Sequence, residues 1–134
     1  MIPVTLEQEV IEGLLSSPKK LSSKYFYDAK GDELFQQIMH LDEYYLPAAE
    51  LEILTNQTEK MIEDFPYESF NIVELGAGDG SKTVHFIKRL IALGKDITYY
   101  PLDISYNVLK INERLMQQEI PALPMELIPG NYFQ

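Results

Sequence analysis

The feature that most constrains the fold of this chain is an alternation of short apolar runs and amphipathic runs that begins at residue 71. β-branched or aromatic runs bounded by turn residues indicate strands, and apolar residues at helical spacing indicate helices. The expected order is strand, helix, strand, helix and strand, over 71–75, 81–94, 96–103, 105–119 and 125–130. Right-handed crossovers would place the strands in the order 3-2-1, as in half of a doubly wound α/β sheet.

The first half of the chain is predicted to be helical. Apolar residues at helical spacing run through 4–15 and stop at the sequence SSPKK. A second helix should follow, with Asp32 as its N-cap. A third should start near Pro47 and end before Pro66.

The expected sheet is only the first half of such a domain. Strand 71–75 would have one neighbour, and an apolar strand with an unpaired edge favours association. We therefore expect the chain to be a fragment of a larger domain, or to pair with a second copy as a homodimer through the exposed sheet edge. Its expected parts are a helical leader over 1–66 and the half-sheet unit over 67–134.

The composition disfavours several classes of site and partner. There is no cysteine, and the two histidines lack the close spacing of a metal pair, so we expect no metal. We interpret His40 and His85 as structural or solvent-facing, and Asp32-Glu33 as a helix cap or solvated face. The formal net charge of −10 would repel nucleic acid. Because no apolar run approaches roughly 18 residues and no signal peptide is evident, we expect a cytoplasmic protein without a membrane span.

The sequence VELGAGDGSKT, residues 73–83, is the candidate ligand loop. It is one residue short of a Walker A phosphate loop, which needs a glycine immediately before Lys82. It also departs from the dinucleotide fingerprint, which needs a glycine at the same position. Both interpretations are disfavoured because that position is Ser81.

A third pattern fits this loop completely: Glu74-x-Gly76-x-Gly78-x-Gly80, at the end of a strand and opening a helix. It resembles the first motif of Rossmann-like class I methyltransferases, which bind S-adenosylmethionine. Glycines allow close approach of the backbone to such a ligand, and the resemblance implies that Glu74 orders the ammonium group of the cofactor, directly or through water. An ordinary tight turn without a ligand is the alternative.

Asp103, at the end of the second expected strand, supports a nucleoside site. It lies 27 positions after Gly76, where an acidic residue can accept hydrogen bonds from both ribose hydroxyls. Dehydrogenases share this feature, so it indicates nucleoside binding rather than methyl transfer. The alternative is that Asp103 only caps the helix that follows.

The first half carries a more specific resemblance. The sequence SPKKLSSKYFYDAKGDELFQQIMHLDEYYLPAAELEIL is similar to the leader of the histidine-specific methyltransferases of the ergothioneine pathway, whose pattern is K-x-L-x-x-K-[YWF]-F-Y-D-x-x-G-x-x-L-F-x-x-I followed by L-x-E-Y-Y. The resemblance covers nearly the whole chain. The matching residues are Lys20, Leu21, Lys24, Phe26, Tyr27, Asp28, Gly31, Leu34, Phe35, Ile38, Leu41, Glu43, Tyr44 and Tyr45.

The resemblance implies roles for residues at the cofactor site. Gly76 and Lys82 match positions that hold S-adenosylmethionine, Lys82 through the cofactor carboxylate, and Asp103 matches the ribose ligand. In the family, the sequence G-D-[FY] after the third strand contributes to the adenine site. Here it is Gly130 followed by Asn131 and Tyr132, so asparagine keeps one acceptor and loses the charge.

On the substrate side, Tyr44 matches a tyrosine that contacts the substrate amino acid, while Tyr27 and Phe35 match aromatic residues near that pocket. Taken alone, such aromatic residues more often pack in a core. No residue is identified as catalytic, because methyl transfer mainly requires positioning and exclusion of water.

The sequence therefore predicts an S-adenosylmethionine-dependent N-methyltransferase of a small-molecule amino acid, with the α-amino group of histidine as the first substrate. Because the family's remaining substrate residues lie beyond residue 134, we expect this chain by itself to be inactive. The alternative is a non-catalytic Rossmann-like module that binds a nucleoside or a partner protein, with a dehydrogenase fragment as a weaker option.

Overall fold

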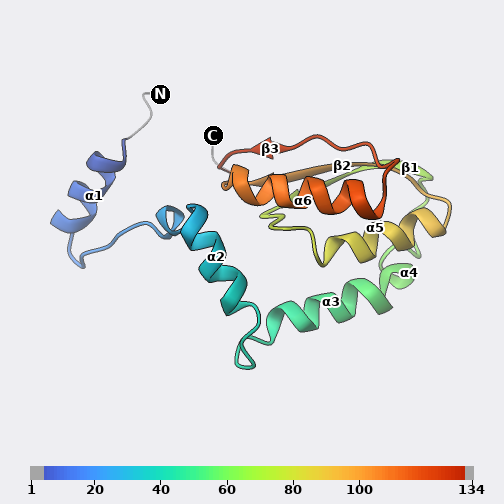
Figure 1. The fold of residues 1–134 in the computed structure, drawn as a ribbon, viewed down its shortest axis with the longest axis horizontal. Helices are drawn as coiled ribbons and strands as arrows, with labels where there is room; N and C mark the ends of the chain where they lie inside the picture. Colours follow the sequence, from blue (N-terminus) through green and yellow to red (C-terminus); the bar gives the residue numbers. More distant parts are fainter. Residues whose placement is uncertain (1–4, 132–134) are drawn as a thin grey trace.

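The computed structural model describes residues 5–131 and has the predicted α/β architecture (Figure 1). Its sheet contains β1 (Ser69–Leu75), β2 (Asp96–Asp103) and the short β3 (Ile128–Pro129). All pairings are parallel and the order is β1-β2-β3, which confirms the predicted position of the second strand between the other two. The parallel register aligns the carboxyl ends of β1 and β2 at one edge of the sheet, where Leu75 pairs with Leu102.

One face of the sheet is covered by α5 (Thr83–Ala92) and α6 (Tyr106–Glu119). Both helices were predicted, and Ser105 is the N-cap of α6 as expected. Their apolar stripes meet the inward side chains of β2, because residues two apart on a strand share a face. The largest fully buried apolar side chains of this core are Tyr99, Ile87, Leu90, Leu109 and Met116.

The opposite face of the sheet is open in the described part of the chain. On β1, inward and outward positions alternate, and the outward side chains Val73 and Leu75 are 59% and 64% exposed. Within residues 5–131, β1 has β2 as its one strand neighbour. The half sheet therefore has the exposed apolar edge that the sequence predicts.

The leader forms a series of helices that runs past the sheet (Figure 1). α3 packs against α5, whereas α1 lies apart from the sheet and contacts the segment that follows it. Across residues 5–131, no helix combines the length and the apolar character that crossing a membrane requires. The leader elements are α1 (Leu6–Leu15), a 3₁₀ turn (Ser23–Phe26), α2 (Ala29–Ile38), α3 (Leu46–Asn56) and α4 (Thr58–Met61).

The start of α2 differs from the prediction. Asp28, not Asp32, is its N-cap and accepts a hydrogen bond from the backbone N–H of Gly31 at 2.8 Å. Gly31 lies inside the first turn of α2. A side chain does not fit at this position, because a Cβ would fall 1.6 Å from the carbonyl oxygen of Phe26. The glycine therefore serves a close approach between backbones, and the helix begins before it.

Two other elements are shorter than predicted. The helix that starts at Leu46 breaks at Gln57, where the backbone has φ −120° and ψ 9°. The third strand is limited to two residues, with an isolated bridge between Met125 and Tyr99 ahead of it. Pro129 has no N–H to donate, which limits how far the strand can pair.

Candidate functional site

A cavity of about 650 Å³ lies where the carboxyl ends of the strands face the leader. The sheet side contributes the predicted site residues Gly76, Gly78, Asp103 and Asn131. The leader side contributes Lys24, Tyr27, Asp32 and Phe35. Ligands of open α/β sheets bind at this edge, beyond the carboxyl ends of the strands.

The glycine loop adopts a conformation that glycine favours. Gly76, Gly78 and Gly80 have φ values of 67°, 57° and 76°. Apart from Gly78 and its two chain neighbours, no described residue has a heavy atom within 4 Å of the position that a Cβ of Gly78 would take, so its Cα faces open space in the cavity. At Gly80, a Cβ would lie 2.8 Å from the side-chain amide of Asn112.

Asp103 joins the glycine loop to the start of α6. Its Oδ2 accepts a hydrogen bond from the backbone N–H of Gly78 at 3.0 Å, and its Oδ1 accepts one from that of Ser105 at 2.9 Å. An ionised carboxylate has about four acceptor sites, so capacity remains for a ligand in the cavity. Asp103 thus supports the loop and the helix start while it lines the cavity.

Glu74 lies under the loop and is not part of the cavity wall. Its Oε1 accepts a hydrogen bond from Thr83 Oγ1 at 2.6 Å and its Oε2 accepts one from Tyr99 Oη at 2.5 Å. Burial raises the pKa of the Glu74 carboxyl, and these two hydrogen bonds oppose that rise. Burial and the nearby Glu74 charge raise the pKa of Tyr99. Contact between Glu74 and the cofactor ammonium remains a prediction.

Asn112 completes this buried network from α6. Its side-chain Nδ2 donates to Tyr99 Oη and to the carbonyl oxygen of Gly78, each at 3.2 Å. Its Oδ1 is buried and has no hydrogen-bond partner among the described residues. A fully buried amide therefore holds the glycine loop from below.

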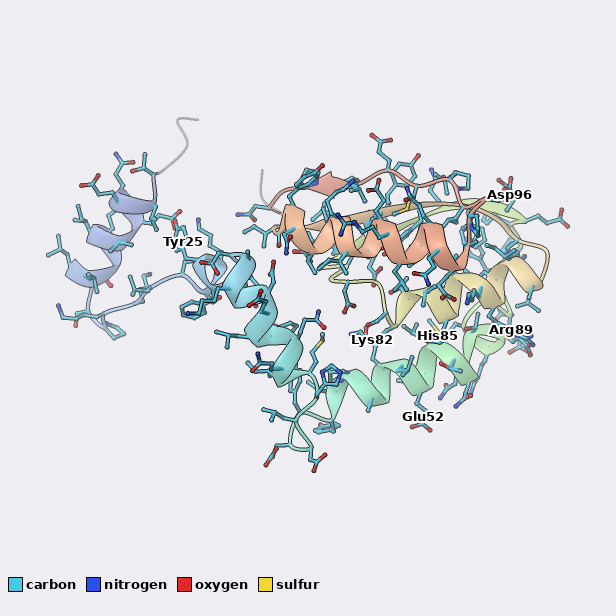
Figure 2. The ribbon with its side chains drawn as sticks, in the orientation of Figure 1. Tyr25, Glu52, Lys82, His85, Arg89 and Asp96 are labelled. Atoms are coloured by element: carbon cyan, nitrogen blue, oxygen red, sulfur yellow. The ribbon has the colours of Figure 1, made fainter. Side chains whose placement is uncertain are left out.

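Lys82 lies at the N-terminal end of α5, on the side that faces α3 (Figure 2). Its ammonium forms an ion pair with Glu50 of α3. Lys82 and Gly80 are not among the residues that line the cavity. The implied contact between Lys82 and a cofactor carboxylate stays a prediction, and that contact would compete with Glu50.

The three predicted substrate-side aromatic residues lie together. The ring centroid of Phe35 lies 6.4 Å from the ring centroids of both Tyr27 and Tyr44, and the ring planes are inclined by 69° in each pair. Edge-to-face pairs of this kind are favourable. Tyr27 and Phe35 line the cavity, and Tyr44 lies behind Phe35 without lining it.

The remaining predicted positions do not share one location. Asn131 lines the cavity, whereas Tyr132 lies outside the described residues. His40 and His85 are exposed. No group of histidine, cysteine, aspartate and glutamate between residues 5 and 131 could hold a metal ion.

Sequence reasoning missed two contributions. Asp32 was interpreted as a cap or solvated residue, yet it is 8% exposed and lines the cavity. Its signal was the four-residue spacing to Gln36, which places both on one helix face. Asn112 was also missed, although it is a polar residue at helical spacing between the apolar Leu109 and Met116.

The cavity fits a ligand with both polar and apolar parts. Asp103 provides acceptors for hydroxyl groups, and Gly76 and Gly78 line the cavity without side chains that would keep a ligand from the backbone. Ile104 and Val108 form an apolar part of the wall that suits a flat ring. These properties match those of a nucleoside with a polar tail.

Comparison with known proteins identifies sequence relatives. The model of a family described as histidine-specific, S-adenosylmethionine-dependent methyltransferases matches residues 6–134. The chain is 33% identical over 129 residues to the histidine N-alpha-methyltransferase of Mycobacterium tuberculosis, covering 96% of this chain and 40% of that protein. It is 36% identical over 107 residues to the 4-dimethylallyltryptophan N-methyltransferase of Claviceps fusiformis, covering 80% of this chain and 30% of that protein. The chain thus spans well under half the length of these relatives.

A structural relative supports the fold. A protein from Methanococcus maripaludis, described as a candidate S-adenosyl-L-methionine-dependent methyltransferase, superposes with a TM-score of 0.53. Sequence identity is 18%, and the match covers 84% of this chain and 44% of that chain. At that identity the likeness establishes the Rossmann-like fold.

Proposed function

The chain belongs to the histidine-specific, S-adenosylmethionine-dependent methyltransferase family, and from this premise we propose that the protein transfers a methyl group from S-adenosylmethionine to the α-amino group of histidine. The proposed substrate follows the histidine N-alpha-methyltransferases of two mycobacterial species, which match at 33% and 31% identity. The proposal keeps the cytoplasmic location expected from the sequence.

The observation that carries the proposal is the contact between the glycine loop and the end of β2. Asp103 Oδ2 accepts the Gly78 N–H at 3.0 Å, and both residues line the same cavity. One carboxylate therefore fixes the loop and faces the space where a ribose would lie. An ordinary tight turn would not require this arrangement beside a cavity of about 650 Å³.

When bound, S-adenosylmethionine supplies an electrophilic methyl group on its sulfonium. The chain's own residues then have to bind the cofactor and the substrate, orient them and exclude water. Asp103 would hold ribose hydroxyls, Gly76 and Gly78 would let the cofactor approach the backbone, and Asn131 would contribute to the adenine site. Lys82 would pair with the cofactor carboxylate after it leaves Glu50.

On the substrate side, the chain has to place an unprotonated amine. A free α-amino group has a pKa of about 8, so a usable fraction is deprotonated at neutral pH without a strong base. Tyr27 and Phe35 line the cavity opposite the glycine loop, where aromatic rings would stabilise the positive charge that develops on the amine nitrogen as it accepts the methyl group. Tyr44, in ring contact with Phe35, is proposed to contact the substrate amino acid.

The first test is calorimetric titration with S-adenosylhomocysteine, with NAD and ATP as controls. Selective binding of S-adenosylhomocysteine is expected. Asp103→Ala should weaken this binding by about tenfold or more, because hydrogen bonds to a charged group are lost. Selective binding of NAD would instead support the dehydrogenase alternative.

The second test is methyl transfer by the purified protein to a panel of amino acids, followed by mass spectrometry. Histidine should be methylated in preference to tryptophan, which is included because one relative acts on a substituted tryptophan by its name. In the full-length protein, cofactor binding without methylation of any amine would favour the non-catalytic nucleoside-binding module. We expect the 134-residue chain by itself to bind the cofactor more readily than it transfers methyl groups.

A further inference from the structure

One polar face of α2 contacts both loops that border the cavity. Asp32 and Gln36 are four residues apart, so their side chains lie on the same side of the helix. Asp32 reaches the start of α6, and Gln36 reaches the glycine loop. We call Asp32 and Gln36 the α2 contact pair.

The Asp32 contact is the more deeply buried of the two. Asp32 is 8% exposed, and its Oδ2 accepts a hydrogen bond from Ser105 Oγ at 2.6 Å. The same hydroxyl accepts the backbone N–H of Val108 as the N-cap of α6, and the backbone N–H of Ser105 is held by Asp103. Ser105 therefore links the carboxylates of Asp32 and Asp103 through one hydrogen bond to each.

The Gln36 contact acts on the other loop. Its Nε2 donates to Asp79 Oδ2 at 3.0 Å, and Asp79 Oδ1 accepts from both the backbone N–H and the hydroxyl of Ser81. Asp79 lies between Gly78 and Gly80 in the loop. The side-chain amide of Gln36 thus contacts Asp79, whose carboxylate also binds Ser81 within the glycine loop.

We propose that Asp32 and Gln36 are positioning residues, which fix the glycine loop and the Asp103–Ser105 turn at the spacing that the nucleoside site requires. The effect on cofactor affinity rests on the proposed function, whereas the effect on the loops does not. Because the two side chains leave one helix face, both contacts form together when α2 lies against the carboxyl edge of the sheet. Burial of Asp32 makes its contact costly to lose, since a buried carboxylate without a partner is strongly disfavoured.

The contact pair also explains how the leader helps to form the site. Asp32 and Phe35 line the cavity from neighbouring positions of α2, so a shift of this helix would move the wall and release both loops at once. The leader therefore defines part of the cofactor cavity in addition to the proposed substrate side.

The first experiment measures amide hydrogen exchange in the ligand-free protein, comparing Asp32→Ala and Gln36→Ala with wild type. Asp32→Ala should speed exchange of Ser105 and Val108 by at least about threefold, and Gln36→Ala should do the same for residues 78–81. The matched controls Glu33→Ala and Gln37→Ala change exposed neighbours on the same helix and should leave both loops unchanged. Wild-type exchange in both loops of both variants would overturn the proposal.

The second experiment measures the affinity for S-adenosylhomocysteine by calorimetry. Asp32→Ala and Ser105→Ala should each weaken binding by about tenfold, and the double variant should be no weaker than Ser105→Ala alone, because Ser105→Ala already removes the bond to Asp32. Asp32→Asn keeps an acceptor for the Ser105 hydroxyl and should recover affinity to within about threefold of wild type. A merely structural role would not produce this recovery together with non-additivity.

The two experiments separate the two proposals. If wild-type protein binds no S-adenosylhomocysteine while Asp32→Ala still releases the Ser105 turn, the positioning role stands and the proposed function fails. If wild type binds and the losses from Asp32→Ala and Ser105→Ala simply add, Asp32 does not act through Ser105 and the positioning proposal is overturned.

Discussion

Replacement of glycine by alanine should have different effects at three positions with positive φ. Gly78 and Gly94 have open space around the would-be Cβ, so alanine should cost about 1–2 kcal/mol of unfolding free energy through backbone strain alone. Gly80→Ala should cost about 1–3 kcal/mol more, because its Cβ would lie 2.8 Å from Asn112. Urea unfolding measures these differences.

Ligand affinity separates the same three variants further. Gly78 lines the cavity, so Gly78→Ala should also weaken S-adenosylhomocysteine binding, whereas Gly94→Ala at the end of α5 should not. Adding Asn112→Ala should relieve part of the extra cost at Gly80. Equal losses of stability at Gly78 and Gly80 would show that the Asn112 contact does not limit the loop.

Glu74 should give the folded protein a pH dependence of definite sign. Because burial raises its pKa above the ordinary 4.5, the folded chain keeps this proton at pH values where the unfolded chain has lost it. The contribution of Glu74 is full below pH 4.5 and falls as pH rises through the raised pKa. Wild type should therefore lose stability relative to Glu74→Gln as the pH rises from 4.5 through the raised pKa of Glu74, measured by urea midpoints.

The opposite slope would mean that the hydrogen bonds from Thr83 and Tyr99 outweigh burial and depress the pKa of Glu74. Tyr99→Phe removes one of these bonds and keeps the ring. It should steepen the loss of stability with rising pH, because one source of support for the charged carboxylate is gone.

At the scale of residues, the sequence could predict those parts of the site whose backbone conformation requires glycine. The spacing of Gly76, Gly78 and Gly80 predicted a glycine loop after the first strand, and all three residues have positive φ. Asp32 could not be placed in the same way, because an acidic residue near a helix start is usually a cap. Its partner Ser105 lies 73 residues away, and only the folded sheet brings the two together.

At the scale of elements, the ion pair between α3 and α5 should oppose binding of the cofactor tail. Lys82 pairs with Glu50, and a cofactor carboxylate would have to replace or share that partner. Glu50→Gln should therefore raise the affinity for S-adenosylhomocysteine by about twofold to fivefold, a modest gain because both side chains are partly exposed. Calorimetry at low ionic strength measures this effect.

Adenosine is the matched control for that variant, because it lacks the amino acid tail. Its affinity should not change in Glu50→Gln. A loss of S-adenosylhomocysteine affinity would mean that Glu50 positions Lys82 for the ligand, and an equal change for adenosine would place the effect away from the tail.

Element positions were largely predictable because periodicity reflects burial. β2 coincides with the predicted 96–103, and α6 begins after its predicted cap at Ser105. The break at Gln57 was not predictable from apolar spacing, which continues through it. Thr58 Oγ1 instead donates to the carbonyl oxygen of Leu54 at 2.6 Å, a local bond that competes with the helix.

At the scale of the whole molecule, the sequence predicted the sheet order because right-handed crossovers leave few choices. The sequence could not predict how the leader packs against the sheet unit. Helical spacing shows that each helix has an apolar face, but it does not show which surface that face contacts. Some of the leader's contacts with the sheet unit are polar and specific, as at Asp32 and Gln36. Such contacts leave no periodic signal.

The open face and edge of the sheet should make the 134-residue chain associate as its concentration rises. Val73 and Leu75 are 59% and 64% exposed beside the edge of β1 that pairs with no other strand of residues 5–131, and burying such a surface is favourable. Val73→Lys with Leu75→Lys should reduce association, measured by sedimentation velocity over a range of concentrations. Leu15→Lys is the control, because Leu15 is 81% exposed on α1, apart from the sheet. If Leu15→Lys abolishes association and the β1 variant does not, the leader rather than the sheet edge joins the copies.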